Sequence, residues 1–313
     1  MRMIKILSLA VSGILCFILG WQLSRLHQPL PEAVPAPRLL SIEEPAPEGP
    51  EDAPLTQQEP APEAPVEAQF PSFVLRMPPL NLDENMIRHL EEFRVQAGEL
   101  SKQYPADYLL YAPGEEKRIA LTFDDGPDLY ATPRILDILK EAGVRATFFV
   151  QGQNGAKYPD ILDRMSREGH LIANHSWSHP RPFSIEDEAL LEEVEKTQAL
   201  LEDMPRFFRP PYGLVSPSQM EKFIQAGYRA VAWSVDSMDW YAEDPDEIKK
   251  CVLENIHPGA IILMHCAGGP DNRRATVEAL GDILAALKDR GYEPVTIDEL
   301  LKKGAAAQSE KAY

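Results

Sequence analysis

Cysteine and basic side chains are both scarce in this chain of 313 residues. Of three cysteines, Cys16 lies in an apolar N-terminal run, which leaves Cys251 and Cys266 as the only possible pair outside it. A secreted disulfide framework has more cysteines at regular spacing, so we predict two buried thiols that pack as small hydrophobic groups. Lysine and arginine number 31 against 49 acidic residues. This balance argues against nucleic acid as a partner, because phosphate binding needs clustered cations.

Two motifs of common enzyme classes are absent from the sequence as well. No G-x-S-x-G segment occurs, so nothing indicates the nucleophile of a serine hydrolase. No glycine-rich phosphate loop is apparent, so nucleotide chemistry is not indicated either. Any chemistry of this chain must therefore come from other residue types.

Residues 1–27 predict a membrane anchor. Arg2 and Lys5 precede an apolar stretch from Ile6 to Leu23, and about 18 apolar residues are just enough to cross a bilayer as a helix. A signal peptide would have a shorter apolar core and a small-residue cleavage site, so an uncleaved anchor is favoured. Because the basic residues stay inside, we expect the rest of the chain outside the cytoplasm, as a single-pass protein of the cell membrane or, after cleavage, a secreted one.

Residues 28–80 predict a disordered linker rich in proline, glutamate and alanine. Nine acids and one base between Gln28 and Phe70 give a local net charge of −8, out of −18 for the chain, and both repulsion and proline favour an extended spacer. In residues 81–112, apolar positions recur every three or four residues and predict an amphipathic helix, Asn81–Lys102, capped by Asn81 or Asp83. We expect this helix to pack on the following domain, although a stalk or a dimer helix would have the same pattern.

From residue 113 to residue 303, short apolar runs alternate with helical patterns. The predicted strands are Arg118–Phe123, Ala146–Val150, Leu171–Asn174, Phe207–Arg209, Ala230–Val235, Ala260–His265 and Pro294–Ile297. The predicted helices are Pro133–Glu141, Pro159–Glu168, Glu186–Asp203, Pro217–Ala226, Asp246–Glu254 and Arg274–Arg290. Repeated strand–helix units predict an α/β fold with a parallel sheet. Because the length is short for eight full units, we expect a distorted (β/α) barrel of about seven parallel strands, with residues 304–313 as a tail.

Several single residues carry local predictions. Thr132 before Pro133 is typical of a helix N-cap followed by proline at the first helical position. His170 precedes a strand and is expected at the surface, whereas Trp233 is expected in the core. Four glycines stand where a left-handed helix cap is wanted: Gly143, Gly169, Gly227 and Gly291.

Polar clusters stand at the C-terminal ends of five predicted strands. They are Asp124 and Asp125 after the first strand, His175 and His179 after the third, Arg209 to Tyr212 at the fourth, Asp236, Asp239 and Trp240 after the fifth, and His265 at the end of the sixth. Parallel α/β folds place their active sites at this edge of the sheet. Five such clusters together predict one active site.

A metal site is the first part of that prediction. His175 and His179 are four residues apart, which would place both imidazoles on one side of a helical turn. With a carboxylate from Asp124 or Asp125 they form a two-histidine, one-carboxylate set that leaves coordination positions open. Adjacent carboxylates at a strand end also need a cation or a base nearby. We therefore predict a divalent metal, zinc foremost and cobalt or another first-row metal otherwise, that activates water and polarises a carbonyl.

Acid–base groups are the second part. The aspartate that does not bind metal would accept a proton from the attacking water, held ionised by Arg209. His265 would donate a proton to a leaving amine, kept charged by Asp239 or Asp236. A base, a metal, an acid and an arginine clamp predict hydrolysis of an amide or an ester. Tyr212 and Trp240 are candidates for stacking on a sugar face.

Five motifs in this order resemble those of the NodB-homology polysaccharide deacetylases, carbohydrate esterase family 4. They are Thr122-Phe-Asp-Asp-Gly-Pro127, His175-Ser-Trp-Ser-His179, Arg209-Pro-Pro-Tyr-Gly213, Asp236-Ser-Met-Asp-Trp240 and Ile262-Leu-Met-His265. The resemblance extends from about residue 116 to residue 303, so the anchor, the spacer and the amphipathic helix lie outside it.

The resemblance implies a distorted (β/α) barrel, metal-dependent deacetylation and a role for each matching residue. The implied roles are catalytic base for Asp124, metal ligands for Asp125, His175 and His179, orientation of the base for Arg209, oxyanion stabilisation by the Tyr212 N–H, general acid for His265, its partner for Asp239, and the acetyl pocket for Leu263.

The glycan stays open, because members of this family act on peptidoglycan, on chitin or chito-oligosaccharides, or on acetylated xylan. An exported, anchored enzyme suggests the wall of its own cell, so we expect peptidoglycan, with chito-oligosaccharide or acetylxylan as alternatives. Two other functions share the same residues in part. A non-haem iron oxygenase also uses two histidines and one carboxylate but needs neither the second aspartate nor the arginine. A wall-glycan-binding module would retain the metal site without turnover.

Overall fold

The computed structural model describes residues 71–302 except 73, 115, 203, 270 and 271. The predicted anchor, most of the predicted linker and the tail therefore lie outside the described residues. None of the helices that the structure describes has the length and the hydropathy that crossing a membrane requires.

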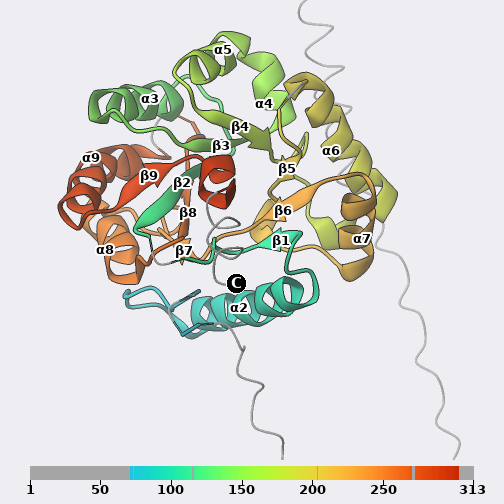
Figure 1. Cartoon of the computed structure of the whole chain (residues 1–313), viewed down its shortest axis with the longest axis horizontal. Helices are drawn as coiled ribbons and strands as arrows, with labels where there is room; N and C mark the ends of the chain where they lie inside the picture. The colour runs from blue at the N-terminus through green and yellow to red at the C-terminus, as the bar shows by residue number, and fades with distance from the viewer. Residues whose placement is uncertain (1–70, 73, 115, 203, 270–271, 303–313) are drawn as a thin grey trace, which may run out of the picture. The chain divides into compact units, whose positions relative to one another are not determined.

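A curled sheet of nine parallel strands forms the centre of the domain (Figure 1). Its order is β1-β6-β5-β4-β3-β2-β8-β7, with β9 paired to β2. The strands are β1 (Tyr108–Leu109), β2 (Arg118–Asp124), β3 (Thr147–Val150), β4 (Leu171–Asn174), β5 (Phe207–Phe208), β6 (Arg229–Val231), β7 (Val235–Asp236), β8 (Ile261–His265) and β9 (Glu293–Val295). The parallel, barrel-like α/β fold is thus confirmed, with nine strands in the described residues rather than about seven, because β1 was not predicted and one predicted strand is divided into two.

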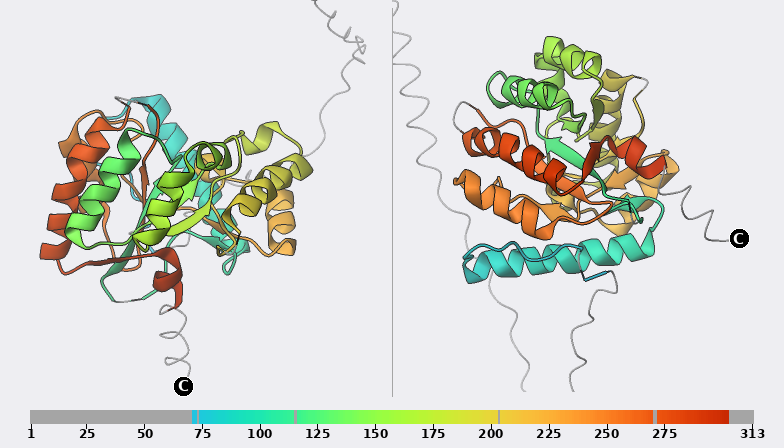
Figure 2. Two further views of the ribbon diagram at one scale, coloured as in Figure 1. Left: turned by 90° about the horizontal axis from the view of Figure 1, so that it is seen from above. Right: turned by 60° about the vertical axis from the view of Figure 1, so that its left-hand side comes forward.

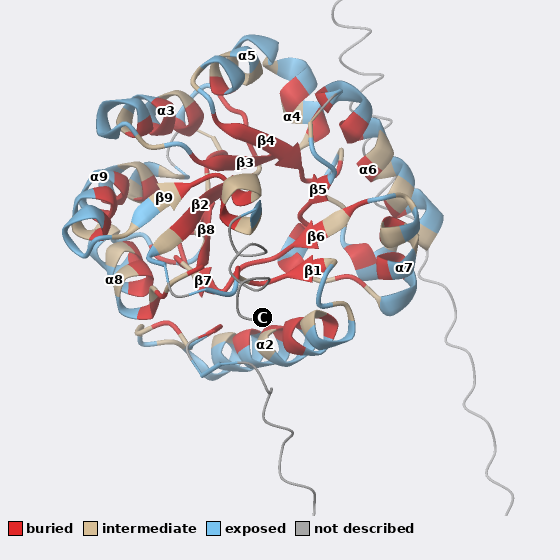
Figure 3. Cartoon of the chain, in the orientation of Figure 1, coloured by how far each residue is buried: buried red, intermediate tan, exposed pale blue. Residues whose placement is uncertain are grey.

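Helices surround the outside of this sheet (Figure 2). They are α2 (Glu84–Gln103), α3 (Ala131–Ala142), α4 (Gly152–Lys157), α5 (Pro159–Arg167), α6 (Asp187–Leu201), α7 (Pro217–Gln225), α8 (Pro245–Asn255) and α9 (Arg274–Asp289), with short 3₁₀ turns η2 (Pro182–Ser184) and η3 (Pro211–Gly213). Each helix turns a buried face inward and an exposed face outward, whereas the strands are buried throughout most of their length (Figure 3). This is the pattern expected when amphipathic helices cover a parallel sheet.

Strand β2 shows how the sheet positions the site. Ile119, Leu121 and Phe123 belong to the core cluster that also contains the apolar faces of α3 and α9. Because successive side chains of a strand point to opposite faces, Thr122 and Asp124 point to the other side, into the barrel. Both are buried there, and β3 and β8 pair with β2 on either side. The alternation therefore fixes the direction of the first catalytic candidate.

The predicted strand Ala230–Val235 is in fact two short strands, β6 and β7. Between them the chain changes partners: Ala232 N–H donates to Leu109 O (2.8 Å), and Ser234 N–H donates to Ile261 O (3.0 Å). The sheet order accordingly ends in β1 at one side and β7 at the other. Helix α2 lies beside the edge strand β1 (Figure 1).

Helix α2 packs on the domain, as the amphipathic pattern predicted. Asp83 caps it, because its Oδ1 accepts hydrogen bonds from Asn85 N–H and Met86 N–H, each at 2.9 Å. Phe93 stacks on Trp233 with ring centroids 4.7 Å apart. The packed chain begins before the expected helix, since Val74 and Leu75 are also buried.

Two local predictions were wrong, and each for a physical reason. Thr132 is not an N-cap: α3 begins at Ala131, and Asp128 Oδ1 accepts from the first N–H groups, while the Thr132 hydroxyl donates to Cys266 O (2.8 Å). His170 is buried rather than exposed, because its Nδ1 accepts from Ala146 N–H (3.1 Å). The glycine-containing helix α4 was not predicted at all. Cys251 and Cys266 are buried free thiols, as expected, and the four capping glycines have φ between 66° and 80°.

Candidate active site

Asp125, His175 and His179 meet at the C-terminal edge of the sheet. Asp125 Oδ1 lies 3.7 Å from Nε2 of His175 and 3.7 Å from Nε2 of His179, and one ligand atom from each residue lies within 4.8 Å of the others. Ligands about 2.1 Å from a tetrahedral zinc ion stand about 3.4 Å apart. The spacing of these three groups therefore fits one divalent metal ion.

The protonation of these groups also fits a metal. Burial, and then the neighbouring His175, lower the pKa of His179 to about 4, so its imidazole is neutral, as a ligand must be. Burial alone would raise the pKa of Asp125, but His265, His175 and His179 outweigh it and hold that pKa below its ordinary value. His175 Nδ1 lies 2.7 Å from Arg209 O, and donation from Nδ1 leaves Nε2 free to bind metal.

The two neighbouring aspartates point in different directions. Asp124 Oδ1 lies 2.7 Å from Arg209 Nη1, and its Oδ2 lies 3.7 Å from His175 Nε2, at the edge of the metal site. Asp125 has a φ of 74°, which turns it out of the strand, and its Oδ1 accepts a hydrogen bond from Gln151 (2.8 Å). The choice between Asp124 and Asp125 is thereby resolved: Asp125 joins the histidines, and Asp124 joins the arginine.

Arg209 is fully buried and anchors Asp124 from inside the barrel. Its Nη1 also donates to the Thr122 hydroxyl (2.7 Å), while Nε and Nη2 donate to the carbonyls of Val231 (3.0 Å) and Ala232 (2.9 Å). The guanidinium carbon lies 4.0 Å from the centre of the Phe149 ring. These contacts fix the guanidinium and so fix the carboxylate that it binds.

His265 forms a second charged pair, with Asp239. His265 Nδ1 lies 2.7 Å from Asp239 Oδ1, and Asp239 Oδ2 accepts from His265 N–H (2.8 Å) and from the Thr276 hydroxyl (2.9 Å). Burial lowers the pKa of His265, but Asp239 outweighs burial and raises that pKa to about 9. Because the same pairing holds the pKa of the buried Asp239 below its ordinary value, the pair is ionic at neutral pH.

Asp236, the alternative partner for His265, binds Met238 and Trp240 instead. Its Oδ1 accepts from Met238 N–H (2.7 Å) and from the indole N–H of Trp240 (3.1 Å). Burial raises the pKa of Asp236 to about 6. Asp236 therefore orients the Trp240 ring, and Asp239 alone pairs with His265.

Backbone strain is concentrated around this site. Seven non-glycine residues of the described chain have positive φ, and five of them belong to the motifs: Asp125, Ser176, His179, Tyr212 and Met238. The expected helical turn at 175–179 is absent; the segment is an irregular loop in which Ser176 Oγ accepts from His179 N–H (3.1 Å). A non-glycine residue with positive φ lowers the stability of the fold by of order 1–3 kcal/mol. Such conformations persist where the surrounding structure holds side chains in set positions.

One cavity of about 200 Å³ connects these groups. Its lining includes the predicted residues Asp124, Asp125, His175, His179, Tyr212, Asp236, Trp240, Leu263 and His265. Arg209 and Asp239 stand behind Asp124 and His265 rather than in the cavity wall. The Tyr212 ring lies 4.9 Å from His179 and beneath the guanidinium of Arg181 (4.6 Å). The structure thus brings all of the predicted site residues together.

Other contributors to the cavity and its support were not predicted. His89, Leu90 and Phe93 of α2 line the same cavity, as does Trp233, which is both buried and part of the wall. Gln151 supports Asp125, and Thr276 and Arg273 hold Asp239. The apolar period of α2 indicated a packed face, but nothing in it indicated which surface that face would cover.

Comparisons with known proteins agree with this geometry. Residues 111–231 match the family model described as polysaccharide deacetylase. A peptidoglycan-N-acetylglucosamine deacetylase of Bacillus cereus is 39% identical over 199 residues, which are 62% of this chain and 72% of that protein. A chitooligosaccharide deacetylase of Bradyrhizobium sp. is 39% identical over 191 residues, which are 56% of this chain and 87% of that protein.

Solved structures resemble this one over the same region. The Bc1960 peptidoglycan N-acetylglucosamine deacetylase has a TM-score of 0.60 and 38% identity, covering 62% of this chain and 92% of its own. The wild-type BA3943 pseudoenzyme from Bacillus anthracis has a TM-score of 0.55 and 29% identity, covering 61% and 68%. Relatives of this identity and coverage, together with the five motifs that meet in one cavity, establish that the chain belongs to the polysaccharide deacetylase family, carbohydrate esterase family 4.

Proposed function

We propose that this protein is a metal-dependent de-N-acetylase that hydrolyses the acetamido groups of a glycan outside the cytoplasm, with peptidoglycan as the leading substrate. The observation that carries the proposal is the convergence of three units on one cavity: the Asp124–Arg209 pair, the Asp125–His175–His179 set and the His265–Asp239 pair. A binding site for an acetylated sugar would need none of the buried charges that these pairs contain.

Each unit has a distinct role in the proposed hydrolysis. Asp125, His175 and His179 hold the metal, zinc foremost, which when bound supplies an activated water and polarises the acetyl carbonyl. Asp124, oriented by Arg209 (2.7 Å), accepts a proton from the attacking water. His265, kept as an imidazolium by Asp239 (2.7 Å), donates a proton to the leaving amine nitrogen.

The remaining site residues bind and orient the substrate. The backbone N–H of Tyr212 donates to the oxyanion as charge develops on the carbonyl oxygen. Leu263, buried in the cavity wall, packs against the acetyl methyl group. Trp240, held by Asp236 (3.1 Å), presents its ring to a sugar face.

The substrate and the location are proposed together. Curated relatives include peptidoglycan-N-acetylglucosamine and chitooligosaccharide deacetylases, so both glycans are within reach of this site. An anchor at residues 1–27 and an acidic spacer at residues 28–80 would hold the domain outside the membrane, facing the wall of the cell. Peptidoglycan is therefore the leading substrate, and chito-oligosaccharide the alternative.

Family membership by itself does not establish turnover, because one structural relative is described as a pseudoenzyme. The acid–base pairs favour turnover here. A module that only bound glycan would gain nothing from an imidazolium whose pKa is raised to about 9 beside the cavity.

Acetate release by the full-length protein in detergent tests the proposal. The substrates are peptidoglycan, chito-oligosaccharides and acetylxylan, each with chelator and then with zinc or cobalt restored. We expect release that chelator abolishes and metal restores, and that Asp124→Asn removes. Asp289→Asn, at the far end of α9, is the matched control and should keep activity. Metal binding without acetate from any substrate would favour the binding module, and iron-dependent oxygen uptake would favour an oxygenase.

A further inference from the structure

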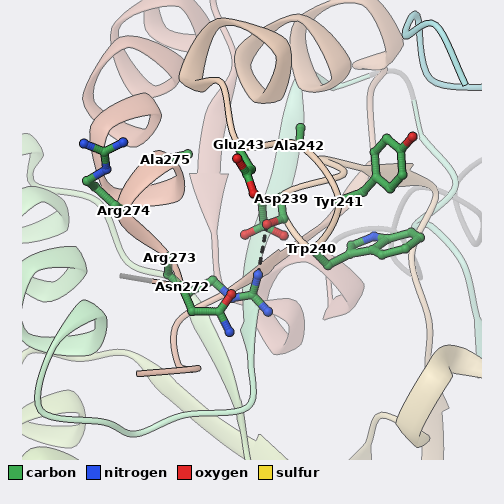
Figure 4. A pocket seen from close by; sticks show the side chains of 9 residues that line it. All are labelled: Asp239, Trp240, Tyr241, Ala242, Glu243, Asn272, Arg273, Arg274 and Ala275. Atoms are coloured by element: carbon green, nitrogen blue, oxygen red, sulfur yellow. Dashed lines mark hydrogen bonds between the residues drawn. The ribbon is translucent and has the colours of Figure 1, made fainter. Parts of the chain in front are cut away.

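A second cleft shares Trp240 with the catalytic cavity. It has a volume of about 600 Å³ and is lined by Trp240, Tyr241, Glu243, Asn272, Arg273 and Arg274, among others; we call it the arginine cleft. Trp240 and Asp239 border it directly (Figure 4), and Trp240 also lines the catalytic cavity. A glycan bound across Trp240 would therefore extend from one space into the other.

We propose that the arginine cleft binds a carboxylate on the sugar next to the one that is deacetylated. This inference rests on the proposed function and specifies its substrate. Peptidoglycan carries a lactyl or peptide carboxylate on every second sugar, whereas chito-oligosaccharides and acetylxylan have no such group. A carboxylate site at this position thus makes the enzyme selective for peptidoglycan over neutral acetylated glycans.

Arg273 supplies the inner cation of the cleft. Its Nε and Nη1 donate to the carbonyls of Ala267 (3.1 Å) and Asp239 (2.9 Å), which fixes the guanidinium next to Trp240 (Figure 4). A guanidinium has five N–H donors, and among the residues that the structure describes Nη2 has no hydrogen-bond or ion-pair partner. Arg273 is thus positioned to donate to a carboxylate in the cleft.

Arg274 supplies an outer cation at the rim. Its side chain is 70% exposed, and it forms a long ion pair with Glu278, at 3.9 Å from Nε. Such an exposed, long ion pair contributes little, so the guanidinium remains available to a ligand. Glu243 is the acid of the cleft that faces no partner of its own among the described residues, since the Asp239 carboxylate is bound by His265 and Thr276. The two guanidiniums of the cleft thus stand beside one acid, Glu243, that no cation of the described residues pairs with.

The two arginines stand in a protein that is acidic as a whole. The chain has a formal charge of −18, of which −8 lies between Gln28 and Phe70, and an acidic surface repels an anionic polymer. Neutral sugars need no cation for binding, because aromatic faces and hydrogen bonds suffice. Two arginines beside the proposed sugar platform are accordingly the feature that favours an acidic neighbour sugar.

Selectivity of binding is the readout that separates this role from a structural one. Calorimetry on the full-length protein in detergent would give the Kd of two tetrasaccharides of equal length. One is chitotetraose, and the other alternates N-acetylglucosamine with N-acetylmuramic acid that has free lactyl carboxylates. The quantity compared is the ratio of the two Kd values. Damage to the fold or to the Asp239 loop weakens both ligands, whereas loss of a carboxylate partner changes the ratio.

We expect the wild type to favour the acidic tetrasaccharide. Arg273→Gln should reduce that preference by about tenfold, as for a charge-assisted hydrogen bond, and Arg274→Gln by about threefold, as for an exposed ion pair. Glu243→Gln should increase it. The matched control is Lys288→Gln, which removes one positive charge from the same helix about 21 Å away and should leave the ratio unchanged.

Three results would overturn the inference: no preference in the wild type, an equal loss for both ligands in Arg273→Gln, or the same change of ratio in Lys288→Gln. Acetate release from the two tetrasaccharides, measured in parallel, keeps the two proposals apart. Release from neither ligand with an intact Kd ratio would contradict the proposed function and support the cleft. Release from both ligands with a ratio of one would support the function and contradict the cleft.

Discussion

Replacement of Arg209 by methionine is the most demanding test of the structure. Arg209 is fully buried, and its guanidinium donates to the carboxylate of Asp124, to one hydroxyl and to two carbonyls, at 2.7–3.0 Å. Methionine keeps an apolar stem of similar length but removes the charge and every donor. Asp124 would then be a buried carboxylate that has lost its guanidinium partner, with the His175 ring at 3.7 Å as its remaining basic neighbour in the metal-free protein.

The expected loss of stability is about 3–5 kcal/mol, as is found when one partner of a buried ion pair is removed. Two carbonyls that lose their donors add to the loss at about 1–3 kcal/mol each. The guanidinium no longer has to be desolvated, which offsets a part of both losses. Urea unfolding followed by circular dichroism, with chelator present so that metal binding does not contribute, gives the free energy directly.

A double-mutant cycle separates the charge from the packing. Because Asp124→Asn removes the carboxylate that Arg209→Met leaves unpaired, the double variant should be more stable than Arg209→Met alone. The control is Arg229→Met. The Arg229 guanidinium Nε donates to Ala106 O in an exposed position, so its loss should lower the free energy of unfolding by about 1 kcal/mol. A loss below about 1 kcal/mol in Arg209→Met, or strict additivity in the cycle, would contradict the buried pair.

Three further predictions concern charge, metal and packing. Asp239→Asn should lower the free energy of unfolding most near pH 5–6. The stability that comes from the raised pKa of His265 (about 9) is full below about pH 6.5 and is lost as the pH rises through about 9, and the stability that comes from the lowered pKa of Asp239 is lost in acid. A loss of stability that is the same at pH 5.5, 7 and 10, in urea titrations, would contradict this. Zinc at about 100 times its Kd should stabilise the wild type by about 2.7 kcal/mol in a thermal-shift assay, and an equal shift in Asp125→Ala would rule out this ligand set. Gly213→Ala should lower the free energy of unfolding by about 2–4 kcal/mol, because Gly213 has a φ of 81° and a new Cβ would lie 2.5 Å from Trp233 and 2.7 Å from Phe93. The control is Gly143→Ala, at a residue with a φ of 66° and no atom within 4 Å of the new Cβ. Equal losses of stability in the two variants would mean that the aromatic pair does not restrict this site.

The residues of the active site could be predicted because they follow the regular part of the fold. Strand–helix alternation places every strand end at one edge, so Asp124, His175, Arg209 and His265 were expected to meet there. Their meeting needs no knowledge of loop geometry. The ladder pairing of Asp124 with His265, on adjacent strands, is a direct result.

The details that were not predicted depend on irregular backbone. From the sequence, either Asp236 or Asp239 could pair with His265. A turn in which Met238 has a φ of 58° places Asp239 beside His265. The break between β6 and β7 arises because the chain leaves one partner strand for another, which no hydrophobic pattern indicates. In the same way, α4 begins at a glycine and has no apolar period, although its neighbour Gln151 holds Asp125.

The packing of α2 has a consequence for how the chain folds. Phe93 and Trp233 stack although 140 positions separate them in the sequence. Most of the stability of a helix in a protein comes from tertiary packing, and Phe93 of α2 stacks on Trp233, which lies between β6 and β7. Because synthesis proceeds from the N-terminus, this contact of α2 forms only after Trp233 has been made. Contacts between such distant segments form slowly. One wall of the catalytic cavity is thus completed late in folding, and a shortened chain that ended before Trp233 would have no enclosed site.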